Sequence, residues 1–410
     1  MYGYKIEDYV PVPEPVSSDY TICAHYYPGW AKREVKFFNI ATKAFHDIEQ
    51  YPKRTPLLGY YDENSPEVFD WQIKWAVEHG ISCFIYCWYM KSDISDKKIT
   101  YDNLLYGHAI HNAYFKSRYR DYMKFAIMWE LDYADYAMPH DKDEVLNKII
   151  PFWVENYFSD KNYLKIDNKP VLYIYVFKKL IDHLGGLDKT RELFDLMEEK
   201  MREYGFDGIH FSGLNSNGDI YASNQWQYSM DEYKQAGADS TFQYCWQMLT
   251  EDLTEYEYKK YCENYMLDSE HILKFINKQI AQRIEYDPYY TMYTLTCARD
   301  SKPWFKILNI DPKGPMVQFR LTPYEWRREL VSTKAKIDKL PDDSIGKKIV
   351  LVDNWNEWAE GHFVAPSLGA GFKYLQALRE VFTKCDNLPD YRLPSTLEMG
   401  PYEDPSENYF

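Results

Sequence analysis

The sequence predicts an α/β fold in which eight parallel strands close into a (β/α)8 barrel of the TIM type, with extended loops after the strands. Two observations indicate this. Eight apolar, strand-like runs follow one another, and segments with helical spacing of apolar residues separate most of them. Strands buried on both faces read as continuous apolar runs, as in a parallel sheet covered by helices. The runs are Tyr20–Tyr26, Ile81–Tyr89, Met123–Leu131, Pro170–Phe177, Gly208–Asn215, Ser240–Trp246, Trp304–Ile310 and Ile349–Trp355.

Helix signals lie between these runs. Ser65-Pro66 combines an N-cap residue with proline at the first helical position, and apolar residues then recur at near-helical spacing until Gly80. Thr322-Pro323 gives the same kind of start signal later in the chain. Further helices are expected at about 144–158, 187–204, 221–236, 253–283, 323–338 and 373–383.

A doubly wound open sheet is the alternative fold. It would usually bring a glycine-rich phosphate-binding turn after its first strand, and Tyr27-Pro28-Gly29-Trp30 is not such a turn. One barrel suits the length of the chain, because such barrels run past ~250 residues as single units. We therefore expect an extended lead-in over residues 1–19, a single barrel domain over 20–385 and a C-terminal tail over 386–410.

The balance of charge favours a neutral polar ligand. The chain has 48 basic and 63 acidic residues, a net charge of −15, which argues against nucleic acid or an anionic membrane as partner. No run approaches the ~18 apolar residues of a membrane span, and the first residues lack the layout of a signal peptide. We expect a cytoplasmic protein with reduced cysteines, or a periplasmic or secreted one if a leader was trimmed.

Aromatic and polar side chains recur at the predicted carboxyl ends of the strands and in the loops beyond them, where barrels carry their active sites. Aromatic rings with a polar tip line grooves and stack on sugar faces, although packing in the core is the alternative for each of them. The candidate substrate-binding residues are Tyr26, Tyr27, Trp30, Tyr60, Trp88, Tyr89, Trp129, Glu130, Asp132, Asn215, Trp246, Asn309, Asp311, Asn354, Trp355, Asn356 and Trp358.

Two carboxylates three residues apart, Glu357 and Glu360, directly follow the last strand. Glycoside cleavage typically needs one protonated and one ionised carboxyl group on either side of the reacting centre. The neighbouring tryptophans would raise the pKa of one of them by excluding water, and the neighbouring asparagines would bind sugar hydroxyls. The alternative is a pair of exposed loop acids near the start of the last helix.

The motif Asn356-Glu357-Trp358-Ala359-Glu360-Gly361 resembles the Asn-Glu-Trp-x-Glu-Gly signature of glycoside hydrolase family 99 endo-α-mannosidases. It resembles more closely the WbsX-type, family-99-like proteins of bacterial polysaccharide loci. The resemblance extends in order from about residue 20 to about residue 383. Further matching stretches are His25–Trp30, Pro56–Asp62, Phe84–Tyr89 and Phe125–Trp129.

This resemblance implies a (β/α)8 barrel that cleaves α-mannosides or other 1,2-trans glycosides with retention and without metal or cofactor. In the family's scheme, the glutamate matching Glu357 is the base that activates the substrate's own 2-hydroxyl group. The glutamate matching Glu360 protonates the leaving oxygen and then activates water. The chain departs from the family at Glu130, where many members have asparagine, and at Val364–Ser367. These differences bear on which oligosaccharide or polysaccharide is the substrate.

Two functions are alternatives to glycoside hydrolysis. One is a glycan-binding barrel without turnover, and the other is a WbsX-type glycosyltransferase. Asp141-Lys142-Asp143 matches the metal-binding motif of sugar-nucleotide transferases, but its position before a predicted helix favours an N-cap followed by first-turn acids. His25 is expected to be a core histidine.

Overall fold

The computed structural model describes residues 9–30, 35–37, 40–42, 45, 48–90, 98–131, 138–216, 219–225, 227–307, 311, 313–385, 387–400 and 402. Eight parallel strands form the barrel, in the spatial order β10, β9, β8, β6, β4, β1, β14 and β11. They are β1 (Thr21–Tyr26), β4 (Ile81–Met90), β6 (Lys124–Trp129), β8 (Lys169–Ile174), β9 (His210–Leu214), β10 (Ser240–Phe242), β11 (Tyr293–Leu295) and β14 (Ile349–Val352).

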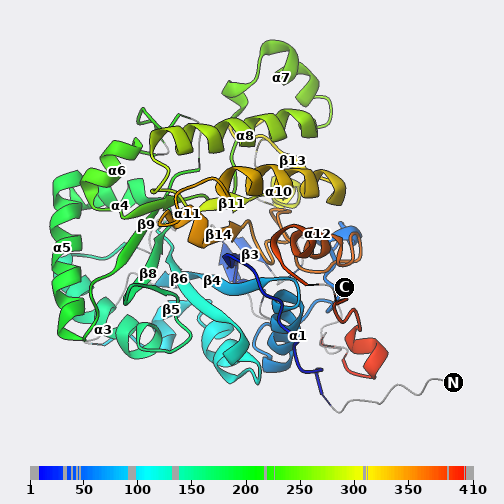
Figure 1. Cartoon of the computed structure of the whole chain (residues 1–410), viewed down its shortest axis with the longest axis horizontal. Coiled ribbons are helices and arrows are strands. Elements are labelled where there is room, and N and C mark those ends of the chain that lie inside the picture. Colours follow the sequence, from blue (N-terminus) through cyan, green and yellow to red (C-terminus); the bar gives the residue numbers. More distant parts are fainter. Residues whose placement is uncertain are drawn as a thin grey trace.

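A parallel bridge between Thr241 and Thr291 closes the barrel between β10 and the start of β11. The Thr241 N–H donates to the Tyr290 carbonyl at 2.8 Å, and the Met292 N–H donates to the Thr241 carbonyl at 2.9 Å. Since eight strands join into a parallel barrel surrounded by helices (Figure 1), the predicted fold class is confirmed.

The strands are apolar because both of their faces are buried. All four residues of β14 are buried, and so are nine of the ten residues of β4. A polar side chain on such a strand would face either the barrel interior or the helix layer, and it would find no water on either side. The remaining strands form short hairpins or edges: β2 (Val35–Phe37), β3 (Ile40–Thr42), β5 (Leu104–Leu105), β7 (Lys165–Ile166), β12 (Ala298–Arg299) and β13 (Phe319–Arg320).

Helices surround the barrel, and Figure 1 shows α5 and α6 on one side, α10 and α12 on the other, and α7 projecting at the top. The Ser65 and Thr322 side chains cap α1 and α10, each followed by proline, as predicted. The helices are α1 (Pro66–Val77), α2 (Lys142–Glu144), α3 (Ile150–Trp153), α4 (Phe177–Leu184), α5 (Leu187–Glu203), α6 (Met230–Ala236), α7 (Glu255–Tyr261), α8 (Ser269–Tyr286), α9 (Lys302–Ile307), α10 (Pro323–Ile337), α11 (Ile345–Lys348) and α12 (Lys373–Phe382). Among the described residues, no helix is long and apolar enough to cross a bilayer.

The prediction of strand seven is wrong. Within the run Trp304–Ile310, residues up to 307 form helix α9, and 308–310 lie outside the described residues. The true seventh strand is β11, whose Tyr-Thr-Leu sequence is too short and too polar to register as an apolar run. Its one threonine, Thr294, is buried all the same, because the strand lies between β14 and β10.

Two helix predictions also need correction. The segment 253–283 contains two helices, α7 and α8, because residues 262–268 turn the chain between them. In the segment 221–236, only α6 is helical. Ser229 starts it with a capping box in which Ser229 and Glu232 bond each other's backbone N–H groups, so the residues before Ser229 are excluded from the helix.

Both ends of the described chain lie against α1 (Figure 1). The Val16 N–H donates to the carbonyl of Val77. From the other end of the chain, the Tyr402 hydroxyl accepts from the Trp71 indole at 2.8 Å and donates to Glu67. The predicted lead-in and tail therefore both cover the same helix.

A buried arginine connects the end of β9 to helix α8. Arg283 donates to the backbone carbonyl and to the side-chain oxygen of Asn215, at 3.0 and 2.8 Å, and to Gln279. Its guanidinium also lies over the Trp246 ring, 4.9 Å from the centroid. Burial lowers the pKa of Arg283 to about 9, so the guanidinium stays charged at neutral pH. It therefore keeps donating its hydrogen bonds to Asn215.

We predict that Arg283→Met lowers the free energy of unfolding by roughly 2 kcal/mol, because it leaves the buried side-chain oxygen of Asn215 without its donor. Denaturant unfolding measures the change. Arg202→Met is the matched control, since Arg202 makes only an exposed ion pair with Glu198 and should cost under about 0.5 kcal/mol. Equal losses in the two variants would contradict the role of Arg283.

Candidate active site

The chain leaves β14 and forms a tight loop, residues 354–362, which we call the signature loop. Asn354 adopts a left-handed conformation with φ of 62°. Glu357 and His362 form an antiparallel bridge, and the Gly361 N–H donates to the Glu357 carbonyl at 2.9 Å. The loop is therefore a closed turn that holds both glutamates in fixed positions.

Two arginines bind the backbone of the signature loop from outside. Arg54 donates to the carbonyls of Trp358 and Ala359 at 3.0 and 3.2 Å, and Arg320 donates to the Gly361 carbonyl at 3.0 Å. A Cβ atom on Gly361 would lie 2.7 Å from both the Arg320 guanidinium and the Asp300 carbonyl oxygen. With its φ of 76°, this position requires glycine.

Asn356 fastens the loop to the end of strand β1. Its side-chain amide exchanges two hydrogen bonds of 2.8 Å with the backbone N–H and carbonyl of Tyr27. The Trp30 indole donates to the Asn356 carbonyl at 2.8 Å, and the buried Glu63 accepts from the Trp30 backbone N–H at 2.9 Å. Asn356 and Trp30, predicted to bind substrate, thus position the glutamates.

Glu360 is held as a carboxylate by two cations. It accepts from Arg299 at 2.8 Å and from the ring nitrogen Nε2 of His362 at 2.9 Å. Burial opposes its ionisation, but the charges and hydrogen bonds of Arg299 and His362 prevail and lower the pKa of Glu360 to about 2. Its side chain keeps 23% of its surface exposed, so the carboxylate also faces solvent.

A second carboxylate sets the charge on His362. Asp353, fully buried at the end of β14, bonds Nδ1 of the ring while Glu360 bonds Nε2. Burial disfavours the imidazolium, yet the two carboxylates raise its pKa from 6.5 to about 9. Asp353, His362, Glu360 and Arg299 therefore form a chain of alternating charges.

Glu357 occupies a different environment. It is 4% exposed and accepts from the Tyr244 hydroxyl at 3.2 Å; Asn354 in turn donates to that hydroxyl. Burial, followed by the negative charge of Glu360, raises the pKa of Glu357 well above its usual value. The pKa values of the two carboxyl groups are thus shifted in opposite directions, and Glu357 is the one that holds a proton more tightly.

This distribution differs from the one that the resemblance implies. The family's scheme begins with Glu357 ionised and Glu360 protonated, whereas both cations of the site contact Glu360. When two environments separate the pKa values of two carboxyl groups, the higher pKa marks the acid and the lower one the base. The charges therefore favour Glu357 as acid and Glu360 as base.

Most of the predicted aromatic subsite residues are core residues. The Trp88 indole donates to the Tyr157 hydroxyl at 3.1 Å, and the Trp246 indole donates to the Thr294 carbonyl at 2.7 Å. Both are buried between the barrel and its helices. The same holds for Tyr26, Trp129, Trp355 and Trp358, none of which is more than 1% exposed.

The tryptophans beside the glutamates turn away from them for a specific reason. The Trp355 indole donates to Gln72 of α1 at 2.8 Å, and the Trp358 indole lies 3.4 Å from the Tyr61 hydroxyl. Trp358 also packs against Phe363, with ring centroids 4.4 Å apart. Each side chain is 1% exposed and its N–H group is already bonded inside the core, which favours a structural role; their contact with substrate stays a prediction.

Some predicted residues do lie near the pair. Tyr89 and Glu130 lie at the ends of β4 and β6, and both interact electrostatically with the Cys87 thiol. The negative charge of Glu357 acts on the same thiol. Tyr27 packs edge-on against Tyr106 beside them. Tyr60 is partly exposed and packs on Phe45. Tyr27, Tyr60, Tyr89 and Glu130 therefore stay predicted substrate contacts.

The remaining polar predictions divide into three cases. Asn215 and Asn354 are fully buried and bonded to protein groups, Arg283 and Tyr244, which leaves them a structural role. Asp311 is exposed, and its side-chain carboxylate accepts from the Lys313 N–H in a turn. It comes after α9 in the chain and not after a strand. Asp132 and Asn309 lie outside the described residues.

The residues that set the charges of the site, Asp353, His362, Arg299 and Tyr244, are not among the predicted site residues. His362 directly follows the Asn-Glu-Trp-x-Glu-Gly motif and Asp353 lies three residues before it, so their pairing was available as a signal. Arg299 follows β11 and went unnoticed because strand seven was misplaced. Tyr244 was hidden in the middle of the predicted sixth run. His25 is buried among aromatic rings, and burial lowers its pKa to about 3.

Two arrangements bear on metal chemistry. Cys245, Asp353 and His362 have donor atoms within 4.8 Å of one another, but His362 already bonds two carboxylates and Arg299 contacts the Cys245 sulfur. Burial raises the pKa of Cys245 to about 12, so this neutral thiol beside a guanidinium suits a cation poorly. Asp141 caps α2 by accepting from the Glu144 N–H at 2.8 Å, as the N-cap alternative predicts.

Comparison with known sequences identifies relatives over most of the chain. A family model described as Glycosyltransferase WbsX matches residues 34–378. The uncharacterized protein WxcX of Xanthomonas campestris pv. campestris (strain B100) is 21% identical over 367 residues, which is 88% of this chain and 48% of that protein. The chain thus spans about half the length of the named relatives that it matches.

Comparison with solved structures shows the same fold. A GH99 endo-α-mannosidase from Bacteroides thetaiotaomicron, in complex with bis-tris-propane, matches with a TM-score of 0.52 and 14% identity over 88% of this chain and 95% of that one. A protein described as glycoside hydrolase-like matches with a TM-score of 0.55 and 15% identity over 92% and 98%. These likenesses agree with the resemblance that the Asn356–Gly361 motif indicates.

We predict that stability falls on the alkaline side because of His362. Its folded pKa is raised, so its contribution is fully present below the unfolded pKa of 6.5 and is lost as pH rises through about 9. The loss should reach roughly 3 kcal/mol. Denaturant unfolding at several pH values measures it. His362→Gln should lack this part of the pH dependence, and a variant that keeps it would contradict the assignment.

Proposed function

The chain belongs to the WbsX glycosyltransferase family, and from its barrel and its paired glutamates we propose that it is a glycoside hydrolase. The substrates are α-mannosides or similar 1,2-trans glycosides of an oligosaccharide or polysaccharide. The observation that carries this proposal is the pair itself. Two carboxyl groups share one buried site, and their surroundings push their pKa values in opposite directions.

The proposed reaction retains configuration in two steps. The ionised Glu360 accepts the proton of the substrate's 2-hydroxyl, whose oxygen then attacks the anomeric carbon. The bond to the leaving oxygen breaks as Glu357 gives that oxygen its proton. In the second step Glu357, now ionised, takes a proton from water. The water oxygen opens the 1,2-anhydro sugar while Glu360 returns its proton to the 2-oxygen, so the two inversions give net retention.

The order of the roles follows the charges of the site. Arg299 and His362 stabilise Glu360 as the base, and burial beside Tyr244 keeps Glu357 protonated as the acid. This is the reverse of the assignment that the family resemblance implies. The likeness to an endo-α-mannosidase fold supports the reaction class without deciding which glutamate takes which role.

Synthesis from a sugar nucleotide is the competing function, because the family's description names a glycosyltransferase. The Asp141-Lys142-Asp143 motif gives it no support, since Asp141 is occupied as a helix cap. Incubation with mannose-, rhamnose- and glucose-containing oligosaccharides tests hydrolysis through released sugars. Binding without products would favour a glycan-binding barrel, and transfer from a sugar nucleotide would favour the transferase.

We predict different leaving-group effects for the two glutamates. Glu357→Gln should lower kcat/KM on an unactivated mannoside by roughly 10² to 10⁴-fold, but much less on 2,4-dinitrophenyl α-mannoside, whose leaving group needs no proton. Glu360→Gln should lose activity on both substrates, because the 2-hydroxyl still needs a base. The opposite pattern would restore the roles that the resemblance implies, and full activity in both variants would end the proposal.

The pH profile gives an independent prediction. Activity requires Glu360 ionised and Glu357 protonated. The pKa of Glu360 is about 2, so kcat/KM should not fall until strongly acidic pH. On the alkaline side it should fall through the raised pKa of Glu357. Glu360→Gln removes a negative neighbour, so the alkaline limb of its residual activity should move to lower pH. An unmoved limb would assign the titration to another group.

A further inference from the structure

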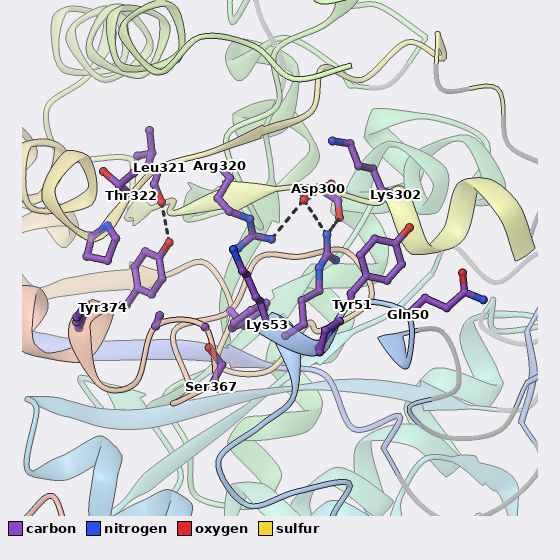
Figure 2. Close-up of a pocket in the computed structure, with 17 residues that line it drawn as sticks. Gln50, Tyr51, Lys53, Asp300, Lys302, Arg320, Leu321, Thr322, Ser367 and Tyr374 are labelled. Carbon is purple, nitrogen blue, oxygen red and sulfur yellow. Dashed lines mark hydrogen bonds and ion pairs between the residues drawn. The ribbon is translucent and has the colours of Figure 1, made fainter. Parts of the chain in front are cut away.

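A second pocket lies on the outer side of the signature loop. It has a volume of about 760 Å³ and lies between the short helical turn Pro52–Arg54, the segments after β11 and β14, and the starts of α10 and α12. Figure 2 shows Lys53, Asp300 and Arg320 converging on it. We call it the basic pocket. Loops after the seventh and eighth strands often bind phosphate in barrels of this class.

The basic pocket has an unusual charge for this chain. Lys53, Arg54, Lys302, Arg320 and Lys373 all line it, and Asp300 is the one acidic residue among the described residues of its lining. The sequence as a whole carries a net charge of −15. Five cations around one cavity in an acidic protein repel one another unless an anion lies between them.

Asp300 balances only part of this charge. Its carboxylate pairs with Arg54 at 2.7 Å and with Arg320 at 3.5 Å, as the dashed lines in Figure 2 show. Lys53, Lys302 and Lys373 have no ion-pair partner in the described part of the chain. Three ammonium groups are thus free for a ligand.

The walls of the pocket suit a sugar ring. The Arg54 guanidinium lies over Tyr51 and the Arg320 guanidinium over Phe363, at 5.0 and 5.5 Å from the ring centroids. Tyr374 also lines the cavity, and its hydroxyl is already bonded to the Leu321 carbonyl. The pocket therefore offers aromatic and aliphatic surface between its cationic groups, which a bare inorganic anion would leave unused.

The basic pocket shares a wall with the catalytic pair. Arg54 and Arg320 hold the carbonyls of Trp358, Ala359 and Gly361, while the Asp300 N–H donates to the Glu360 carbonyl at 2.7 Å. The same short loop therefore presents its glutamates on one side and its arginine-bound backbone on the other.

We propose that the basic pocket binds an acidic sugar of the substrate, so that the glycan cleaved at Glu357 and Glu360 is anionic. The recognised group is a carboxylate, sulfate or phosphate on a saccharide ring. This inference rests on the proposed function. It differs from the expectation of a neutral ligand, which followed from net charge alone.

Binding of matched saccharides to the full chain tests the proposal by calorimetry. Trigalacturonic acid is compared with maltotriose, and glucose 6-sulfate and glucose 6-phosphate are compared with glucose. At least one anionic probe should bind about tenfold or more tightly than its neutral counterpart, and added salt should weaken it. Equal affinities for charged and neutral probes would overturn the proposal.

Charge reversal locates the site. Lys53→Glu/Lys373→Glu, at two exposed positions, should weaken the anionic probe about tenfold or more. The control Lys274→Glu/Lys278→Glu changes the net charge equally at exposed positions of α8 and should leave binding within about twofold. Equal losses in both variants would overturn the site. Binding of UDP-glucose alone, abolished by the first variant, would assign the pocket to a nucleotide diphosphate and overturn the proposal as well.

Failure here is separable from failure of the proposed function. Glu357→Gln/Glu360→Gln lacks the catalytic pair but keeps the basic pocket, so it should retain the preference for anionic probes. Anion binding without hydrolysis of any glycan, acidic or neutral, by the unaltered protein would end the proposed function and leave the anion site in place. Hydrolysis of neutral glycans without any preference for anionic probes would leave the proposed function in place and overturn the anion site.

Discussion

The chain of charges from Asp353 through His362 to Glu360 and Arg299 is the constraint on which the site depends. Each member is buried or nearly so, and each would be costly to bury alone. Together they compensate one another, and because both cations contact Glu360, the two glutamates of one short loop become chemically different. Other contacts hold the signature loop in the position that keeps the two glutamates different. Asn356 fixes the loop to the end of β1, and Arg54 and Arg320 fix its backbone from the other side.

The aromatic richness of the sequence has a structural explanation. Trp88, Trp246 and Trp355 lie between the barrel and its helices, and each indole N–H finds a buried acceptor. A tryptophan used this way fills a large volume and orients a neighbouring group with the same side chain. The same ring types that line sugar-binding grooves are here used mainly to hold the strands and helices in register.

The barrel and the signature loop could be predicted from sequence because both are local patterns. Ile349–Val352 is a continuous apolar run, and the motif that follows it is contiguous. Strand β11 could not be predicted in this way, because it has only three residues and its Thr294 is buried by partners from elsewhere in the chain. Arg299, which follows this strand, was missed with it. The role of these tryptophans could not be predicted from sequence, because composition does not say whether an indole faces a ligand or a helix. Three-dimensional neighbours such as Gln72 for Trp355 decide that.

Gly361 restricts which sequences can form the signature loop. A side chain there meets the Arg320 guanidinium, the Asp300 carbonyl and, at 3.0 Å, the Arg54 guanidinium. A relative that retains both glutamates but carries a bulkier residue at this position would have to lose or move one of these arginines. The glycine and the two arginines should therefore change together during evolution, and a sequence that keeps only the glutamates has lost the framework that orients them.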